Sequence, residues 1–553
     1  MMKKIKIKNI VLLLSLLMMA GCDFMDCDES DNISKQEVLD SYNRVKQLAT
    51  NVYGFLKADF CSIDGAMLDA ATDDAVHIYK SSTIQRFVDG TWSANNLVDN
   101  VWGHYYEGIR AANFYLKETA GLTFDEWKYS DDYQDVMKEF TNYQYEVRFL
   151  RAYFYFELIK RYRNVPFILD VLTQDEANKV TPESYEKIAT FIMDECSELA
   201  RILPVNYNGF STKERGRITR TAAMALKSRV ALYMASPLFS ADSEDKWQKA
   251  AEAAYDIIKQ KADLGVDLIP YPQLFNDENN KKAEVILYRP TGESGDFEKA
   301  NYPIGVEGGK TSTCPTQNLM EAYDMKDGTP FVWNNQSNPY DNRDPRMKYT
   351  IVCNGMKWPV NAIDISEGGA SGLPLQNATT TGYYLKKYVN NTISFEPGST
   401  VTKKQHNWVL FRYGEILLNY AEAMINAFHD PNYKDAVYNM SAREAVNLIR
   451  GRTNIALAGF PADITEKDFV KRLKNERRVE LAFEGHRFWD VRRWKELEQT
   501  ANIYGVKITK NNGTISYEKF LLENRTVTDN MYFYPIPNTE RFKNPNLGQN
   551  PGW

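Results

Sequence analysis

The sequence predicts a mainly α-helical fold, in which a scaffold of paired helices is interrupted by a large insertion of loops and short strands. Apolar residues recur at helical spacing over much of residues 33–260 and again over about 406–495. Between these parts, from about 261 to 405, Gly, Pro, Asn and Asp clusters separate short Val, Ile and Tyr segments, and no long helical period is visible. These two observations define the scaffold and the insertion.

The helical segments are predicted from the spacing of their apolar residues, over residues 33–58, 101–117, 133–163, 183–201, 219–236, 246–260, 412–427, 440–452 and 467–485. Alanines gather in three of them, within 222–231, 250–254 and 421–427. Small residues let helices approach closely, as helix pairs of the tetratricopeptide type require. No constant repeat length is visible, so the sequence alone predicts a tetratricopeptide-like scaffold with imperfect repeats.

Two further regions lack helical periodicity. Residues 60–100 mix aspartates, glycines, Arg86 and Trp92, and we predict a structured loop region there; long loops in compact domains usually carry function. After residue 495 the pattern weakens into short strand-like pieces. The Pro- and Asn-rich tail from about 534 to 553 is predicted to run extended along the surface, with Trp553 as its terminal anchor.

The first residues predict the location of the protein. Lysines precede the apolar run Ile10–Ala20, which is too short for a permanent membrane span and is typical of a signal peptide over residues 1–21. Met19 to Cys22 resembles a lipobox, so Cys22 is the predicted lipidation site. An acidic, solvated tether follows over residues 22–32, and a single body is predicted over residues 33–553.

Composition excludes several classes of function. A net charge of −6 without long basic runs gives no electrostatic footprint for nucleic acid. The cysteines after Cys22 are scattered and indicate neither a disulfide framework nor a metal site, and we find no nucleotide-binding, hydrolase or metalloprotease motif. No cofactor is predicted. Aromatic residues make up 13% of the chain, and their surplus suits stacking on the apolar faces of sugars.

Residues 475–494 form the densest group of charged and aromatic side chains. On one continuous helix, Val479, Phe483 and His486 fall on a single buried stripe. We predict an ionic clasp in which carboxylates pair with arginines of the same segment, formed by Glu480, Glu484, Arg487, Asp490 and Arg493. The alternative is a glycosidase pair of Glu480 and Glu484, about 5–6 Å apart on one helix face. Carboxylates on the same face cannot easily flank a sugar ring, and the arginines would hold both ionised.

The run ELAFEGHRFWDVRRW resembles the C-terminal signature of the SusD/RagB family, the cell-surface glycan-binding lipoproteins of Bacteroidetes nutrient uptake. Other stretches resemble the family in the same order, namely RFLRAYFYFELIKRYRNVPF at 148–167, PTQNLMEAYDMKDG at 315–328, NRDPRM at 342–347, TGYYLKKY at 381–388, FRYGEILLNYAEAMINA at 411–427 and the closing residues 534–553. The resemblance implies tetratricopeptide-like units and a ligand face built by the insertion and the early loops. It also implies an outward-facing outer-membrane location and a TonB-dependent transporter of the SusC type as partner.

The candidate glycan-binding residues lie in the irregular regions, because aromatic residues at stripe spacing on helices usually belong to the core. Trp92 is the first stacking candidate, and a buried loop anchor is its alternative role. The other candidates are Asn95, Asp74, Arg86, Tyr302, Trp333 and Trp358. Arg343, Asp344 and Arg346 are predicted to be structural, because the Asp-Pro step fixes a turn.

Three classes of function stay open. The first is a glycan-binding surface lipoprotein, with binding of peptides or glycoproteins on the same scaffold as its alternative. The second is a secreted glycosidase, for which the sequence shows no opposed carboxylates on separate elements. The third is a protein-binding tetratricopeptide adaptor, which would explain the helices but not the insertion.

Overall fold

The computed structural model describes residues 34–208, 210, 214–241, 243–334, 338–398, 400 and 402–553. The predicted signal peptide, the lipidation site Cys22 and the acidic tether lie outside the described residues. Within the described part of the chain, no helix combines the length and the apolar character that a membrane span requires.

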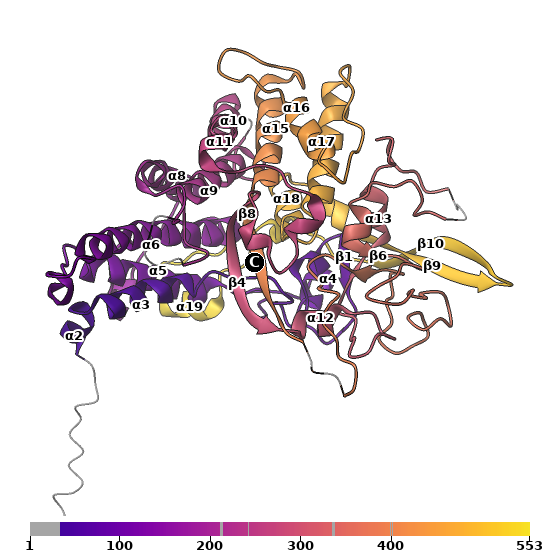
Figure 1. The fold of residues 1–553 in the computed structure, drawn as a ribbon, viewed down its shortest axis with the longest axis horizontal. Coiled ribbons are helices and arrows are strands. Elements are labelled where there is room, and N and C mark those ends of the chain that lie inside the picture. The colour runs from indigo at the N-terminus through magenta and orange to yellow at the C-terminus, as the bar shows by residue number, and fades with distance from the viewer. Residues whose placement is uncertain are drawn as a thin grey trace, which may run out of the picture.

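The helical scaffold consists of helices that pack against their neighbours in the chain (Figure 1). Its first part comprises α2 (Lys35–Leu39), α3 (Tyr42–Tyr53), α5 (Trp102–Glu118), α6 (Tyr133–Tyr162), α8 (Tyr185–Ile202), α9 (Arg220–Ala235) and α10 (Glu244–Lys259). The second part comprises α15 (Tyr413–Phe428), α16 (Ala442–Arg450), α17 (Glu466–Glu480) and α18 (Arg487–Arg493), and α15 packs directly on α10. The predicted mainly α fold is confirmed.

Helix starts follow from local side-chain chemistry. The hydroxyls of Ser184, Thr219 and Ser441 each accept a hydrogen bond from a backbone N–H in the first turn of α8, α9 and α16. Ser441 and Glu444 complete a capping box. The alanines of α9 and α10 are buried between the two helices, which explains how these helices approach closely.

Two predicted helices differ from the structure. The segment 33–58 is divided into α2 and α3, which meet at Asp40 and Ser41. The segment 467–485 ends at Glu480, because Phe483 (φ 59°) and Gly485 (φ 74°) adopt left-handed backbone conformations that a helix cannot contain. The predicted continuous stripe through His486 is therefore wrong.

The insertion is irregular, with short helices and small antiparallel sheets. Its longest strand, β4 (Val285–Ser294), pairs with β8 (Lys404–Arg412), where the sequence predicted the scaffold to resume. Within the insertion, β6 (Ile351–Val352) pairs with β7 (Tyr384–Leu385), and β5 (Thr313–Pro315) pairs with β1 (Ala75–His77) of the early loop region. Its short helices are α11 (Lys261–Leu264), α12 (Asp296–Asn301), α13 (Gln317–Ala322) and α14 (Met347–Thr350). Outside the insertion, α4 (Gln85–Asp89) lies in the early loop region, and α7 (Gln174–Ala177) and the pair β2 (Val165–Pro166) with β3 (Pro182–Glu183) lie within the first part of the scaffold.

The end of the chain is more regular than predicted. Strands β9 (Asn502–Asn511) and β10 (Thr514–Asn524) form a long hairpin that projects from the body (Figure 1), and α19 (Asn538–Lys543) interrupts the predicted extended tail. The indole of Trp553 packs on Trp92, with ring centroids 4.6 Å apart, and its Nε1 donates to the Phe533 carbonyl at 3.0 Å. Trp553 is thus the anchor that the sequence predicted.

Candidate ligand-binding site

The charged segment 475–494 lies at the centre of a buried ionic cluster. Glu480 ends α17 and Glu484 lies in the turn before α18, and both carboxylates are buried. Glu480 accepts hydrogen bonds from Arg346 Nη1 at 2.9 Å, Arg412 Nη1 at 2.8 Å and Arg452 Nη2 at 2.8 Å. Glu484 accepts from Lys387 Nζ and Arg412 Nε, each at 2.7 Å. Every one of these cations comes from outside the segment.

The predicted clasp is therefore correct about burial but wrong about most partners. Asp490 does pair with Arg493 of the same segment, at 2.9 Å. Arg487 instead reaches Asp73 in the early loop region, at 2.9 Å. Helix geometry could not show this, because the turn at residues 481–486 aims Glu480 and Glu484 away from the arginines of α18. The cluster ties the scaffold to both loop regions.

The surroundings of Glu480 and Glu484 do not fit their alternative catalytic role. Burial alone would raise the pKa of Glu480, but the charges of Arg452, Arg412 and Arg346 outweigh it and hold the pKa well below its ordinary value. The pKa of Glu484 is lowered in the same way by Arg412 and Lys387. Neither carboxyl can keep the proton that a glycosidase acid must donate.

Most of the candidate binding residues are buried. Trp92 is 2% exposed, and its ring packs against Phe87, Tyr534 and Trp553. It offers no face to a ligand and takes its alternative role as a loop anchor. Asp74 is buried and forms an ion pair with Arg478 at 2.6 Å. These two predictions are corrected, because the tail and α17 cover the early loop region.

The remaining candidates do not form one site. Arg86 is half-buried and donates to the Leu97 carbonyl at 3.0 Å, whereas Asn95 is exposed and accepts from Asn538 at 2.9 Å. In the insertion, Tyr302 is buried with its hydroxyl donating to the carbonyls of Asn390 and Ile393, and Trp358 is 7% exposed. Trp333 is half-buried beside Phe331. Tyr302 and Trp358 are thus also corrected as stacking platforms.

A surface cavity of about 450 Å³ lies where the early loop region meets the insertion, and we call it the Phe60 cavity. It is lined by Phe60, Cys61, Thr291, Gly292, Glu293, Ser294, Asp296, Phe297 and His406. Phe60 is half-buried and packs edge-on against Phe297, with ring centroids 5.0 Å apart. Exposed carboxylates of Glu293 and Asp296 and hydroxyls stand beside this apolar wall. Apolar and hydrogen-bonding groups together suit a sugar.

Sequence reasoning missed these residues for a clear reason. Phe60 marks the point where helical periodicity is lost, and Glu293 to Phe297 belong to the predicted insertion, but nothing in the sequence placed them together.

A second cavity, of about 430 Å³, lies nearer the start of the same strand β4, beside Tyr53, Tyr143 and Tyr288.

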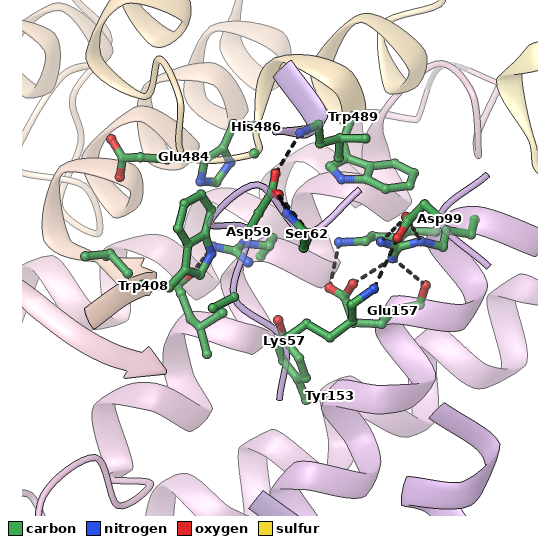
Figure 2. A pocket seen from close by; sticks show the side chains of 18 of the residues that line it. Lys57, Asp59, Ser62, Asp99, Tyr153, Glu157, Trp408, Glu484, His486 and Trp489 are labelled. Atoms are coloured by element: carbon green, nitrogen blue, oxygen red, sulfur yellow. Dashed lines mark hydrogen bonds and ion pairs between the residues drawn. The ribbon is translucent and has the colours of Figure 1, made fainter. Parts of the chain in front are cut away.

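A third cavity lies between the early loop region, α6, β8 and the turn before α18, and we call it the polar cavity (Figure 2). Its volume is about 100 Å³, and its walls include Lys57, Asp59, Ser62, Asp99, Tyr153, Glu157, Lys160, Arg161, Arg229, Trp408, Glu484, His486 and Trp489. Trp408 in its wall packs edge-on against Phe60 of the Phe60 cavity, with ring centroids 5.2 Å apart. Among the described residues, no group of His, Cys, Asp and Glu is arranged to hold a metal ion.

The helical scaffold with its irregular insertion defines the fold class, and comparison with known proteins identifies the family. A sequence model described as "SusD family" matches residues 275–553, and one described as "Starch-binding associating with outer membrane" matches residues 23–232. The chain belongs to the SusD/RagB family.

Individual relatives agree along nearly the full chain. SusD-like protein P25 of Formosa agariphila is 22% identical, covering 88% of this chain and 90% of that protein. The structure of a SusD-like protein from Bacteroides fragilis is 26% identical, covers 95% of this chain and 99% of its own, and superimposes with a TM-score of 0.76. A SusD-like carbohydrate-binding protein from the same organism is 25% identical, covering 92% of this chain and 100% of its own, with a TM-score of 0.76.

Proposed function

We propose that this protein is an outer-membrane lipoprotein that binds oligosaccharides or polysaccharides at the cell surface and delivers them to a TonB-dependent transporter of the SusC type. The observation that carries the proposal is the Phe60 cavity, because it lies between the two loop regions expected to build the ligand face. The family description and the carbohydrate-binding relative support a glycan as the ligand.

The cavity favours binding without turnover. Phe60 supplies an apolar wall, and Glu293, Asp296 and Thr291 supply hydrogen-bonding groups for sugar hydroxyls. Glu293 and Asp296 lie on one short segment that forms a single wall. A glycosidase needs two carboxyl groups on opposite sides of the bond that it cleaves. We therefore infer that bound glycan leaves unchanged.

Isothermal titration with a panel of glycans, run beside a hydrolysis assay, tests the site. Glu293→Gln and Asp296→Asn should each weaken binding about tenfold or more, the usual loss for a hydrogen bond to a charged group. Glu278→Gln, on an exposed helical turn outside the cavity, is the matched control. Wild-type affinity in both cavity variants would place the glycan elsewhere, and binding of peptides only would favour the alternative ligand class.

Delivery requires an anchor and a partner. Cys22, carrying lipid, would tether the body through the acidic segment 22–32 and leave it free to swing over the transporter. Extraction of membranes with a mild detergent should copurify a SusC-type barrel with this protein. Recovery of the protein alone, under conditions that preserve known pairs, contradicts the partner.

A further inference from the structure

The polar cavity presents hydrogen-bond donors that nothing in the protein accepts. Trp408 and Trp489 are each 5% exposed, and neither indole Nε1 has a hydrogen-bond partner among the described residues; the same holds for the imidazole of His486. By contrast, Nε1 of Trp494 donates to Glu422 at 2.7 Å. Figure 2 shows Trp408, Trp489 and His486 around one space, with the nitrogen-bearing edges of both indoles facing it. These N–H groups line the cavity and are therefore available to an acceptor that enters it.

Three of the four acidic side chains of the walls are already paired with basic side chains. Glu157 accepts from Lys160 at 2.6 Å and Arg161 at 2.7 Å, and Asp99 forms ion pairs with Arg161 at 2.8 Å and Lys57 at 3.3 Å. Glu484 is held by Lys387 and Arg412. These three carboxylates therefore cannot supply an acceptor for the indoles.

Basic side chains and the carboxylate of Glu484 lie at the end of the cavity near His486. Burial, and then the charges of Arg229, Arg477, Arg412 and Lys160, lower the pKa of His486 well below its ordinary value, so the imidazole is neutral and donates through one nitrogen. Lys160 Nζ has three donors, and only Glu157 accepts one of them among the described residues. Donors and positive charge converge on the same space.

We propose that the polar cavity is a binding site for a small oxyanion of the carboxylate or phosphate class. Trp408, Trp489 and His486 would each donate a hydrogen bond to the anion, and Lys160 would supply the opposite charge. A metal cation does not suit indole N–H groups, which have no lone pair to offer. The volume of about 100 Å³ is sufficient for a small oxyanion.

Two residues at the mouth of the polar cavity affect anion binding: Ser62 lies where the cavity opens to the surface, and Asp59 carries a charge that repels an anion. Ser62 is exposed and lines the cavity, so the space reaches the surface beside it. Asp59 accepts from Ser62 and from the Leu68 N–H at 2.8 Å, and it has no basic partner among the described residues. Its negative charge opposes an anion, and replacement by Asn should remove this opposition, although the single Oδ1 of Asn can keep only the hydrogen bonds from Ser62 or the one from the Leu68 N–H.

Titration calorimetry with acetate and inorganic phosphate at constant ionic strength tests the proposal. Thermal melts provide a second readout, because an anion that binds only the folded state raises Tm saturably. Trp408→Phe and Trp489→Phe, which keep an aromatic ring and lose the N–H, should each raise Kd about tenfold or more. Asp59→Asn should lower Kd several-fold, and Trp127→Phe, whose Nε1 bonds Glu126 outside the cavity, should leave it unchanged.

Three results overturn the proposal: no saturable effect of any anion on the wild type, wild-type Kd in the folded tryptophan variants, or weaker binding by Asp59→Asn. If the tryptophan variants do not fold, Asp59→Asn decides alone. Glucuronate provides a further arm. Binding of acetate and phosphate indicates a free anion as the occupant, whereas binding of glucuronate alone indicates the acid group of a sugar residue that reaches in at the mouth.

Discussion

Replacing Glu480 by Gln should destabilise the protein strongly. The carboxylate is fully buried and neutralises part of the charge of Arg346, Arg412 and Arg452, whose side chains are each 1% exposed. Removing this carboxylate leaves the three buried arginines with one negative charge too few, because they keep only their other carboxylate partners, and breaking a buried ionic network in this way costs about 3–5 kcal/mol. The free energy of unfolding, measured by urea titration with tryptophan fluorescence, should fall by that amount. Ligand affinity of the folded fraction should stay unchanged, because no contact of Glu480 reaches the Phe60 cavity.

The pH dependence of the same variant provides an independent check. Because the pKa of Glu480 is lowered in the folded state, its contribution to stability is present above the ordinary value of 4.5 and is lost as the pH falls below it. The wild type should therefore lose stability on acidification more steeply than Glu480→Gln. Glu278→Gln, which breaks an exposed pair with Lys281, is the control and should change little. A loss below about 1 kcal/mol, or identical acid slopes in variant and wild type, refutes the reasoning.

Other predictions address the remaining parts of the molecule. Asp69 is 1% exposed, and neither carboxyl oxygen has a hydrogen-bond partner among the described residues. Burial, together with the charges of Asp74 and Asp59, raises the pKa of Asp69 well above 3.8, so the wild type should lose stability as the pH rises above that value. Asp69→Asn should remove this loss and raise the free energy of unfolding at pH 8 by about 1–3 kcal/mol in urea titrations. A variant less stable than the wild type at that pH contradicts this. Trp92→Ala should lower the free energy of unfolding by about 3–5 kcal/mol in the same titrations, because it removes the central ring of a buried aromatic cluster. The glycan affinity of the folded variant should stay unchanged. Weaker glycan binding by a fully stable variant would assign Trp92 to the binding site again. Cys22→Ala should move the protein from the membrane fraction to the soluble fraction, as judged by fractionation and immunoblotting, and continued sedimentation with membranes argues against the lipid anchor.

Local periodicity was sufficient for the helices but not for the candidate site. Helices α6 and α9 follow the predicted ranges closely, because both carry long apolar patterns and α9 begins at Thr219, a capping residue. Trp92 was placed in a loop correctly, but a loop aromatic can be a platform or an anchor. Only the position of Trp553, more than four hundred residues later in the chain, decided that it is buried. The residues of the Phe60 cavity carry no local signal that sets them apart from other insertion residues.

The sequence by itself determined the family, the mainly helical scaffold, the irregular insertion and the burial of the charged segment 475–494, because these depend on motifs and on patterns within one segment. Tertiary structure alone decided which charged side chains form ion pairs. Glu480 binds arginines 134, 68 and 28 residues away in the chain, and Arg487 binds an aspartate 414 residues away. Such pairs depend on how helices and loops pack in space, which side-chain spacing along one helix cannot specify. The same reason explains why the donors of the polar cavity, contributed by α6, β8, α18 and the residue before α18, became visible only in the fold.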